Sequence, residues 1–530
     1  MGSGSAGSVG AVVGATVAIG LLTALVFLVR AGDAGGANWP VGWELRSSDN
    51  GVLFQVVQDV FAGRDLAWSF SPQVYVFPEL PISFAAYLLG AGDVYLYYLF
   101  VAVINNCLLF LALLGVLGLL HPRERISSWL ARAAVATTPL LILPLIGTSW
   151  LVSYHLAPSY YFGMYLMVVA APALFLVRSR RARTLIGVGL AFTAASNPLA
   201  LVFAVPAFVC ALLVRGLRRG IRATGRPIAT AALVLLGALA LRLLLLAPLQ
   251  GTSPLSYIDP EVFRRRLEAF GPYLDYLAYD TSTRVVLVLG VILSIVCLIG
   301  AVTAAAVYLR RTRTPDDRLL VAVYLGLVPL TGLAGTAVLM VTNYLYLWPV
   351  LIAPFVFVLM ALPRGWAGRA LPIAATAVVA VGLFVGAVPN LAHGERYFGY
   401  RSAETQCLDE GLPEGALTGY ATFSDARRMS LTSERGFRLV QVTDAGELSD
   451  WLTNRDYALE AGSFFYVNGR GDELAIDTGF LTGEFGEPDS EFSCGDDQRV
   501  LVYTEPRKLA AIAEYYGPAA SAARMAGRPG

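Results

Sequence analysis

Repeated apolar stretches of about 20 residues constrain this chain more than any other feature of its sequence. Each is long enough to cross about 30 Å of hydrocarbon as a helix, and a helix satisfies its own backbone hydrogen bonds inside a bilayer. Only 15% of the 530 residues are charged, against about a quarter in ordinary soluble domains. We therefore predict a polytopic α-helical membrane protein. We expect eleven spans, at residues 8–29, 94–119, 129–150, 158–177, 184–195, 198–214, 228–248, 284–309, 319–341, 345–362 and 370–388.

Two of these spans come from the stretch 184–214, which is too long for one helix and has arginine clusters at both ends. Asn197-Pro198 lies near its centre. Because proline disfavours a helical conformation in the residue before it, the sequence predicts two short helices that turn at Asn197-Pro198.

Arginine clusters give the expected orientation, because cytoplasmic loops of membrane proteins are rich in Arg and Lys. Eleven spans with a cytoplasmic N-terminus place eighteen arginines inside, provided that the short, proline-containing segment 76–91 lies at the outer surface. One lysine against 38 arginines suggests a GC-rich bacterial genome, so we expect the bacterial plasma membrane. The eighteen are Arg123, Arg125, Arg132, Arg178, Arg180, Arg181, Arg183, Arg215, Arg218, Arg219, Arg222, Arg226, Arg310, Arg311, Arg313, Arg318, Arg364 and Arg369.

The chain divides in charge as well as in hydropathy. Residues 1–388, the predicted membrane domain with outer loops at 31–93 and 249–283, carry a net charge of +11, and the remainder carries −10. The overall charge of +1 and the lack of a basic field argue against a nucleic-acid binder. We expect residues 389–516 to form an extracytoplasmic soluble α+β domain, and residues 517–530 to be a disordered tail.

Secondary structure and one cysteine pair are predicted inside this soluble domain. Strand-like runs occur at 417–423, 437–442, 463–467 and 500–503, and a helix is expected near 447–452. Cys407 and Cys494 bracket most of the domain and would face an oxidising compartment. We favour a disulfide between them over two free thiols.

The first outer loop contains the main catalytic candidate. Asp49 precedes Val52, Leu53, Val56, Val57, Val60 and Phe61, whose spacing gives one apolar face of a short helix at the membrane surface. A carboxylate there suits a general base toward an acceptor hydroxyl. From spacing alone, an N-cap formed by Asp49 or Ser48 is the simpler interpretation.

Four arginines on the predicted outer side are candidates for contact with a phosphate. Arg242 interrupts a run of leucines inside a span, where an ionisable residue is costly and by default a functional candidate; snorkelling to the headgroups is the competing interpretation. Arg264, Arg265 and Arg266 lie in a second predicted surface helix, in the loop 249–283. Arginine suits phosphate oxygens, and ordinary lipid headgroups are an equally good partner for these three.

Other signals are weak or missing. His155, in a short outer loop, has no histidine or cysteine partner at ligand spacing, so a solvated loop residue is favoured over a catalytic or metal-binding one. No phosphate-binding glycine loop, G-x-S-x-G, HExxH or paired CxxC motif occurs. We therefore identify no metal site and no cofactor.

The arrangement resembles the C-type superfamily of membrane glycosyltransferases (GT-C), which includes the protein O-mannosyltransferases and the lipid A aminoarabinose transferases. Three features of residues 8–388 carry the resemblance. The first outer loop combines Asp49, a surface helix and the proline-rich segment Tyr75–Pro81. The hairpin at Asn197-Pro198 is similar to one that recurs in the family, and the aromatic run Tyr344–Pro349 is similar to a family segment ending in proline.

The resemblance implies a GT-C-like fold and an enzyme that moves a sugar, with inversion, from a polyprenyl-phosphate donor to a cell-envelope glycan, lipid or protein at the outer face. It implies Asp49 as the base and basic residues beside the donor phosphate, for which Arg242 and Arg264–Arg266 are candidates by their location. His155 stands where the family often has an acidic residue in its second outer loop. Glu79 and Tyr344, in the family-like segments, become candidates for sugar or acceptor binding. Asn50 follows Asp49, where the family often has glutamate, which leaves the base and a divalent-cation requirement open.

Two other functions compete with this one. A carrier or flippase for lipid-linked sugars would use Arg242 to gate a phosphate, although no inverted internal repeat is evident. A non-catalytic membrane scaffold for envelope assembly would bind its partners through the soluble domain.

Overall fold

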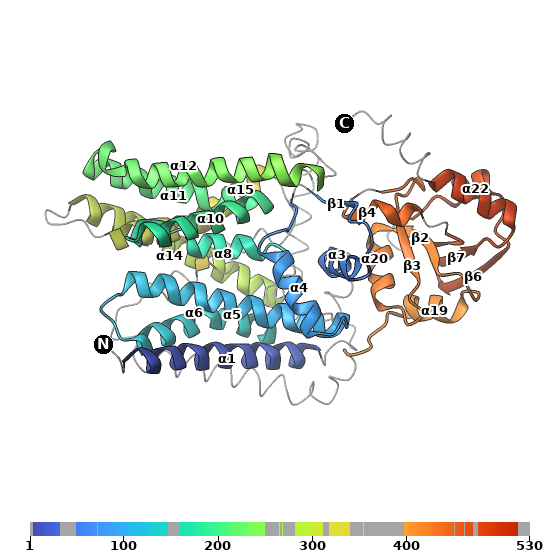
Figure 1. Cartoon of the computed structure of the whole chain (residues 1–530), viewed down its shortest axis with the longest axis horizontal. Coiled ribbons are helices and arrows are strands. Elements are labelled where there is room, and N and C mark those ends of the chain that lie inside the picture. Colours follow the sequence, from blue (N-terminus) through green and yellow to red (C-terminus); the bar gives the residue numbers. More distant parts are fainter. Residues whose placement is uncertain are drawn as a thin grey trace.

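A bundle of long helices occupies one part of the molecule, and a smaller domain with a β-sheet lies at one end of it (Figure 1). The N-terminus lies at the other end of the bundle. The computed structural model describes residues 4–31, 49–71, 73–146, 160–249, 264, 268, 281–310, 317–339, 353–354, 397–449, 451–459, 462–469 and 475–517. The bundle contains α1 (Gly4–Ala31), α5 (Val94–Leu120), α6 (Ile126–Ile146), α8 (Phe162–Ala170), α9 (Ala173–Leu176), α10 (Arg180–Ser196), α11 (Leu199–Arg219), α12 (Ile221–Leu241), α14 (Thr281–Arg310) and α15 (Asp317–Leu339).

Six helical segments in the described part of the chain are long and apolar enough to cross a membrane. This supports a membrane protein, with fewer such helices than the eleven spans predicted. The predicted spans 345–362 and 370–388 lie outside the described residues, apart from positions 353 and 354. The six segments are Ser8–Val29, Val94–Leu120, Leu199–Arg219, Thr224–Leu246, Val288–Arg310 and Asp317–Ala334.

The hairpin predicted at Asn197-Pro198 is confirmed. Helix α10 ends at Ser196 and α11 begins at Leu199. Asn197 is extended, with φ −132° and ψ 90°, as expected for a residue before proline. The backbone N–H of Asn197 still donates to the carbonyl of Thr193 (2.8 Å), so only one residue separates the last turn of α10 from the proline.

Two predicted spans are wrong in their detail. The span 158–177 is not one helix, because its described part forms α8 and α9 with a break at Ala171-Pro172; proline lacks the N–H that would continue the helix. The span 228–248 begins earlier, in α12, and its α-helix ends at Leu241. A π-helical turn, η1 (Arg242–Leu246), and a 3₁₀ turn, η2 (Ala247–Leu249), follow.

Two short helices lie where the bundle meets the C-terminal domain (Figure 1). Helix α3 (Val52–Phe61) is the helix predicted after Asp49, and it buries Val52, Leu53, Val56 and Val57. Helix α4 (Glu79–Leu89) forms within the segment 76–91. Its 11 residues extend about 16 Å, which is too short to cross a bilayer, as predicted.

The C-terminal domain has a five-stranded mixed sheet in the order β3-β2-β5-β7-β6. Strand β2 is parallel to β3 and β5, and β7 is antiparallel to β5 and β6. Its elements are α19 (Ala403–Gly411), β2 (Thr418–Thr422), α20 (Phe423–Thr432), β3 (Arg438–Val442), β4 (Thr453–Asn454), η6 (Arg455–Leu459), β5 (Phe464–Asn468), α21 (Thr478–Phe485), β6 (Ser490–Gly495), β7 (Gln498–Val502) and α22 (Pro506–Tyr516).

All four predicted strand runs are confirmed, as β2, β3, β5 and β7. The helix expected near 447–452 is wrong: Leu448 instead makes an isolated β-bridge with Val442. The tail beyond Gly517 lies outside the described residues.

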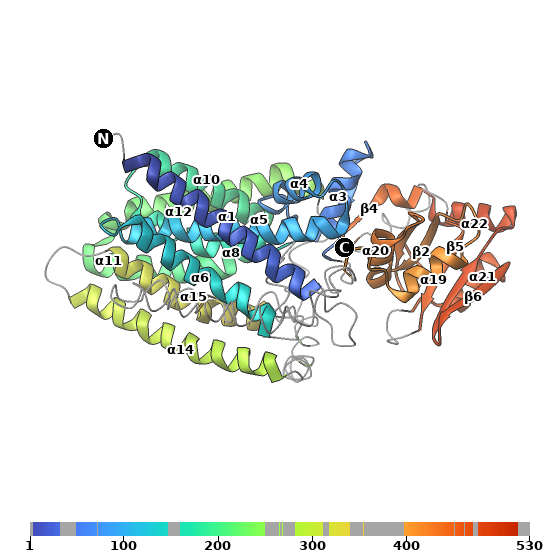
Figure 2. The same cartoon turned by 90° about the horizontal axis from the view of Figure 1, so that it is seen from below.

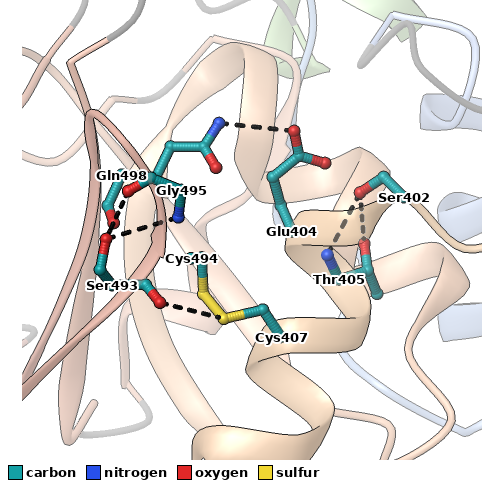
Figure 3. The surroundings of a disulfide bond; sticks show 8 residues. All are labelled: Ser402, Glu404, Thr405, Cys407, Ser493, Cys494, Gly495 and Gln498. Atoms are coloured by element: carbon teal, nitrogen blue, oxygen red, sulfur yellow. Dashed lines mark hydrogen bonds between the residues drawn. A yellow bond between two sulfur atoms is a disulfide. The ribbon is translucent and has the colours of Figure 1, made fainter.

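The predicted disulfide between Cys407 and Cys494 is present. It joins α19 to β6, and Figure 3 shows Gln498 reaching Glu404 beside it. The Gln498 amide donates to the Glu404 carboxylate (3.4 Å), and the Ser402 hydroxyl accepts the N–H of Thr405 (3.2 Å) at the start of α19. The disulfide therefore anchors a helix to an edge strand of the sheet.

Candidate functional site

Three segments from different parts of the chain meet near the turn of the α10–α11 hairpin. The Val74 N–H donates to the Ser196 carbonyl (2.9 Å), and the Phe77 N–H donates to the Ser196 hydroxyl (2.9 Å). From the third segment, Nη1 of Arg242 donates to the carbonyl of Ala195 (3.1 Å). The segment between α1 and α5 and the end of α12 are thus both attached to the turn at Asn197-Pro198.

Arg242 therefore has a defined role in holding the turn. Its guanidinium meets a carbonyl in the last turn of α10, where positive charge is favourable. Arg242 also begins the π-helical turn η1, and π-turns of this kind are frequent at functional sites. The contact to α10 differs from simple snorkelling, because the guanidinium is bound to a neighbouring helix rather than only extended toward the headgroups.

Glu79 is a buried carboxylic acid at this end of the bundle. Its side chain is 1% exposed, and Oε1 accepts the N–H of Gly163 (2.8 Å), in the first turn of α8. Within the part of the chain that the structure describes, Oε2 has no hydrogen-bond partner. Burial raises the pKa of Glu79 to about 7, although the Gly163 N–H opposes this. Such a carboxyl group exchanges a proton near neutral pH, which suits acid–base chemistry.

Asp49 does not cap α3. The N-cap of α3 is Gly51, without a side-chain hydrogen bond to the helix. The hydroxyl of Tyr160 lies 3.4 Å from Oδ2 of Asp49. Burial raises the pKa of Asp49, while the positive charge of Arg427 and the Tyr160 hydroxyl lower it. Asp49 is therefore not the helix cap, and its carboxylate contacts Tyr160 instead. Ser48, the alternative cap, lies outside the described residues.

Three tyrosines connect the surroundings of Asp49 with those of Glu79. The rings of Tyr75, Tyr160 and Tyr161 contact one another, with centroid distances of 4.6 to 5.5 Å. Tyr161 is the N-cap of α8, two residues before Gly163. Tyr75 and Tyr161 both have positive φ, 54° and 68°, a conformation that costs energy in residues other than glycine and is common at functional sites.

Arg427, in α20 of the C-terminal domain, is a site residue that sequence reasoning missed. It is 5% exposed, and its Nε donates to Oε1 of Gln55 in α3 (2.9 Å). Burial lowers the pKa of Arg427 to about 10, and the charge of Asp49 opposes this. Gly51 permits the close approach of α20, because a Cβ there would lie 2.8 Å from Cδ of Arg427. No local spacing in the sequence signals a pair so far apart in the chain.

Another buried carboxylate, Asp59, joins the segment between α1 and α5 to the C-terminal domain. It is 2% exposed and accepts hydrogen bonds from the Trp68 indole (3.0 Å), the Asn454 amide (2.9 Å) and the Tyr457 hydroxyl (2.9 Å). Beside it, β1 (Trp68–Ser69) pairs antiparallel with β4. We refer to Asp59 and its three donors as the Asp59 clasp.

A cleft of about 250 Å³ lies between α3 and the C-terminal domain, next to the Asp59 clasp. Arg438 lies over the ring of Tyr457, with 4.7 Å from its guanidinium carbon to the ring centroid. A cleft lined by an aromatic ring, charged groups and hydroxyls suits a polar ligand. Its lining residues are Phe54, Gln55, Gln58, Asp59, Ala62, Arg64, Ser430, Leu431, Ser433, Gly436, Phe437, Arg438 and Tyr457.

The structure brings Asp49, Glu79 and Arg242 to the same end of the bundle. Arg264 is exposed and forms an ion pair with Glu268 (2.7 Å). His155, Arg265, Arg266 and Tyr344 lie outside the described residues. Among the residues that are described, no group of three or more His, Cys, Asp or Glu side chains is placed to hold a metal ion.

No family model, no curated protein and no solved structure matches this chain. A function is therefore inferred from the chemistry of the site.

Proposed function

We propose that this chain is a membrane glycosyltransferase of the GT-C type that transfers a sugar from a polyprenyl-phosphate donor to a cell-envelope acceptor. In this proposal it crosses the bacterial plasma membrane eleven times, with a cytoplasmic N-terminus and an extracytoplasmic C-terminal domain. Figure 1 supports the orientation, because the N-terminus and the arginine-rich α11–α12 turn lie at the end of the bundle away from that domain. Arginines favour the cytoplasmic side.

The observation that carries the proposal is that Asp49, Glu79 and Arg242 lie at the same end of the bundle. These residues come from the first outer loop and from the end of α12, yet contacts to Tyr160, Gly163 and Ala195 attach them to the same end of the bundle. A base, a second acid–base group and a cation are the groups that a transfer from a phosphate ester needs.

In the proposed reaction, Asp49 accepts the proton of the acceptor hydroxyl as its oxygen attacks the anomeric carbon. The bond between that carbon and the phosphate oxygen breaks on the opposite face, so the configuration inverts and polyprenyl phosphate leaves. Burial raises the pKa of Asp49, which makes it a stronger base than an exposed aspartate. Arg242 is the candidate to stabilise the negative charge on the departing phosphate.

Transfer from labelled donors in proteoliposomes tests the proposal. The full chain would be given undecaprenyl-phosphate-linked mannose, glucose or arabinose, each radiolabelled, together with envelope extract as acceptor. We expect incorporation of label into the extract with release of undecaprenyl phosphate from one donor. Asp49→Asn should lower the rate by about 10²- to 10⁴-fold, which is the usual contribution of a general base.

Asp65→Asn is the matched control, because it makes the same change at an exposed position of the same loop and should leave the rate unchanged. Thermal unfolding of each variant would confirm that it is folded. A folded Asp49→Asn variant with full activity would refute the role of Asp49. Movement of labelled lipid across the vesicle membrane without a new glycosidic bond would refute a transferase and support a carrier.

A further inference from the structure

A second candidate site lies at the opposite end of the bundle, around the α11–α12 turn. A cavity of about 440 Å³ is lined there by four arginines, from α10, α11 and α12. Two apolar side chains of α9 and a proline of α12 complete the wall. The lining residues are Leu174, Phe175, Arg183, Arg215, Arg222, Arg226 and Pro227. We refer to this space as the arginine cavity.

The positive charge of the arginine cavity is only partly balanced. Asp317 forms ion pairs with Arg215 (3.8 Å) and with Arg219 (3.1 Å). Arg183, Arg222 and Arg226 make no ion pair within the part of the chain that the structure describes. Like charges around one cavity repel each other, so an anion bound between these arginines would stabilise the arrangement. Planar guanidinium groups match phosphate oxygens especially well.

Two buried guanidinium N–H groups without an acceptor in the described part of the chain also indicate that an anion binds in the arginine cavity. One Nη of Arg183 donates to the carbonyl of Val177 (2.7 Å), which fixes the side chain. The Nε atoms of Arg183 and Arg215 are buried and have no hydrogen-bond partner among the described residues. A buried donor without an acceptor is costly, and a bound phosphate would supply the missing acceptors.

An apolar groove continues from the arginine cavity between α10 and α12, which pack against each other and lie side by side in both views (Figures 1 and 2). Its volume is about 1060 Å³, and it shares Arg183 and Arg226 with the cavity. Small residues form part of its floor, and large exposed side chains such as Leu233 and Leu244, 69% and 77% exposed, flank it. The small residues are Gly187, Ala191, Gly237 and Ala240.

We propose that the arginine cavity and the groove together bind one anionic phospholipid of the membrane leaflet at this end of the bundle. Its phosphate lies among Arg183, Arg222 and Arg226, and one acyl chain follows the groove between α10 and α12. Basic pockets between helices bind anionic headgroups in this way. A soluble anion would fill the cavity but leave the apolar groove empty, so the lipid accounts for both features.

The arginine cavity is separate from the proposed transferase site, and the groove extends from it to Leu241, Leu244 and Leu245, which lie beside Arg242 in the chain. The groove runs along α10, whose far end is the turn that Arg242 contacts through Ala195. A lipid bound along α10 would therefore stabilise the hairpin without touching Asp49 or Glu79. Its binding does not depend on whether the chain is a transferase.

Thermal unfolding and native mass spectrometry of the full chain in detergent test the proposal. We expect dioleoyl phosphatidylglycerol to bind and to raise the melting temperature. Dioleoyl phosphatidylcholine, dihexanoyl phosphatidylglycerol and inorganic phosphate at the same concentration should each have a much smaller effect. Equal stabilisation by inorganic phosphate would overturn the proposal in favour of a soluble anion, and equal binding of phosphatidylcholine would refute the role of the arginines.

The decisive variant removes the two arginines that the cavity and groove share. Arg183→Gln/Arg226→Gln should weaken phosphatidylglycerol binding at least tenfold, because two charge-assisted contacts are lost. Arg123→Gln/Arg181→Gln removes the same charge at exposed positions that line neither space and should bind like the wild type. If the first variant does not fold, Arg222→Gln, at an exposed position, serves instead. Unchanged binding in a folded cavity variant would overturn the proposal.

Discussion

The Asp59 clasp should hold the C-terminal domain against the segment between α1 and α5, and Asp59→Ala tests this directly. The carboxylate accepts from three buried donors, two of them in the C-terminal domain: Asn454 and Tyr457. Arg64 adds an ion pair at 3.8 Å, which is long and partly exposed and so contributes little. Truncation to alanine removes the acceptor and leaves all three donors buried.

The expected loss of free energy in Asp59→Ala follows from these three hydrogen bonds. A buried donor that loses its acceptor costs about 1–3 kcal/mol, and bonds to a charged acceptor lie at the upper end. Three such losses, partly relieved by entry of water, give about 4 kcal/mol. Asp59→Asn keeps one oxygen acceptor but lacks the charge, so we expect about half of this cost.

Hydrogen exchange at the β1–β4 contact measures the effect where it should occur. The Arg455 N–H donates to the carbonyl of Ala67 (3.0 Å) and joins the two segments. A loss of about 4 kcal/mol in the free energy of local opening should accelerate exchange of this amide about 10³-fold, because 1.4 kcal/mol is a factor of ten. Exchange inside the sheet, for example at Tyr466 in β5, should change much less.

Asp456→Asn is the control for this experiment. Asp456 lies two residues after Asn454, and burial and the charges of Asp65 and Asp59 raise its pKa. Removing this carboxylate relieves repulsion rather than breaking a bond to the clasp, so exchange should stay the same or become slower. The reasoning is refuted if Asp59→Ala leaves exchange at Arg455 unchanged, or if Asp456→Asn accelerates it as strongly.

Two further predictions concern buried or cross-linked groups. Burial raises the pKa of Glu79 from 4.5 to about 7. Ionisation of Glu79 therefore opposes folding, and the free energy of unfolding falls as the pH rises from about 4.5 to 7. The Glu79→Gln variant should be about 3 kcal/mol more stable than the wild type at pH 8 and little different at pH 4. Melting temperatures across this range measure it, and a difference independent of pH would contradict the assignment. Replacing Cys407 and Cys494 by serine opens a cross-link spanning 87 positions and should cost about 4–5 kcal/mol in the loop-entropy model. Denaturant unfolding with and without reductant measures this, and a wild type insensitive to reductant would show that the bond does not contribute.

Local features of this fold were predictable from the sequence because they depend on neighbours in the chain. Proline restricts the residue before it, which placed the hairpin turn at Asn197-Pro198. Helical spacing of apolar residues identified α3, and runs of β-branched and aromatic residues identified β2, β3, β5 and β7. The broken helix at Ala171-Pro172 was missed, although proline was visible there, because the surrounding run is apolar throughout and hydropathy alone does not locate a break.

The candidate site was predictable only in part, because the sequence presents the carboxylates of the first outer loop as equivalent. The structure gives them different roles. Asp93 caps α5, accepting the N–H groups of Tyr95 and Leu96. Asp59 is enclosed by the clasp, and Asp49 faces Tyr160. The partner of Asp49, Tyr160, is more than a hundred positions away in the chain, and a partner of Asp59, Asn454, is nearly four hundred away. No rule of local sequence spacing reveals contacts of this kind.

The same long-range contacts give the C-terminal domain a part in the site. Arg427 is held by Gln55 of α3 and lowers the pKa of Asp49, while the Asp59 clasp fixes the other end of α3 to the domain. Helix α3 is thus attached at both ends to residues that follow the membrane bundle in sequence. Separation of the domain would therefore remove both of these attachments of α3 and the positive charge of Arg427 that lowers the pKa of Asp49. The acidic C-terminal region is for this reason better regarded as one wall of the candidate site than as an independent appendage.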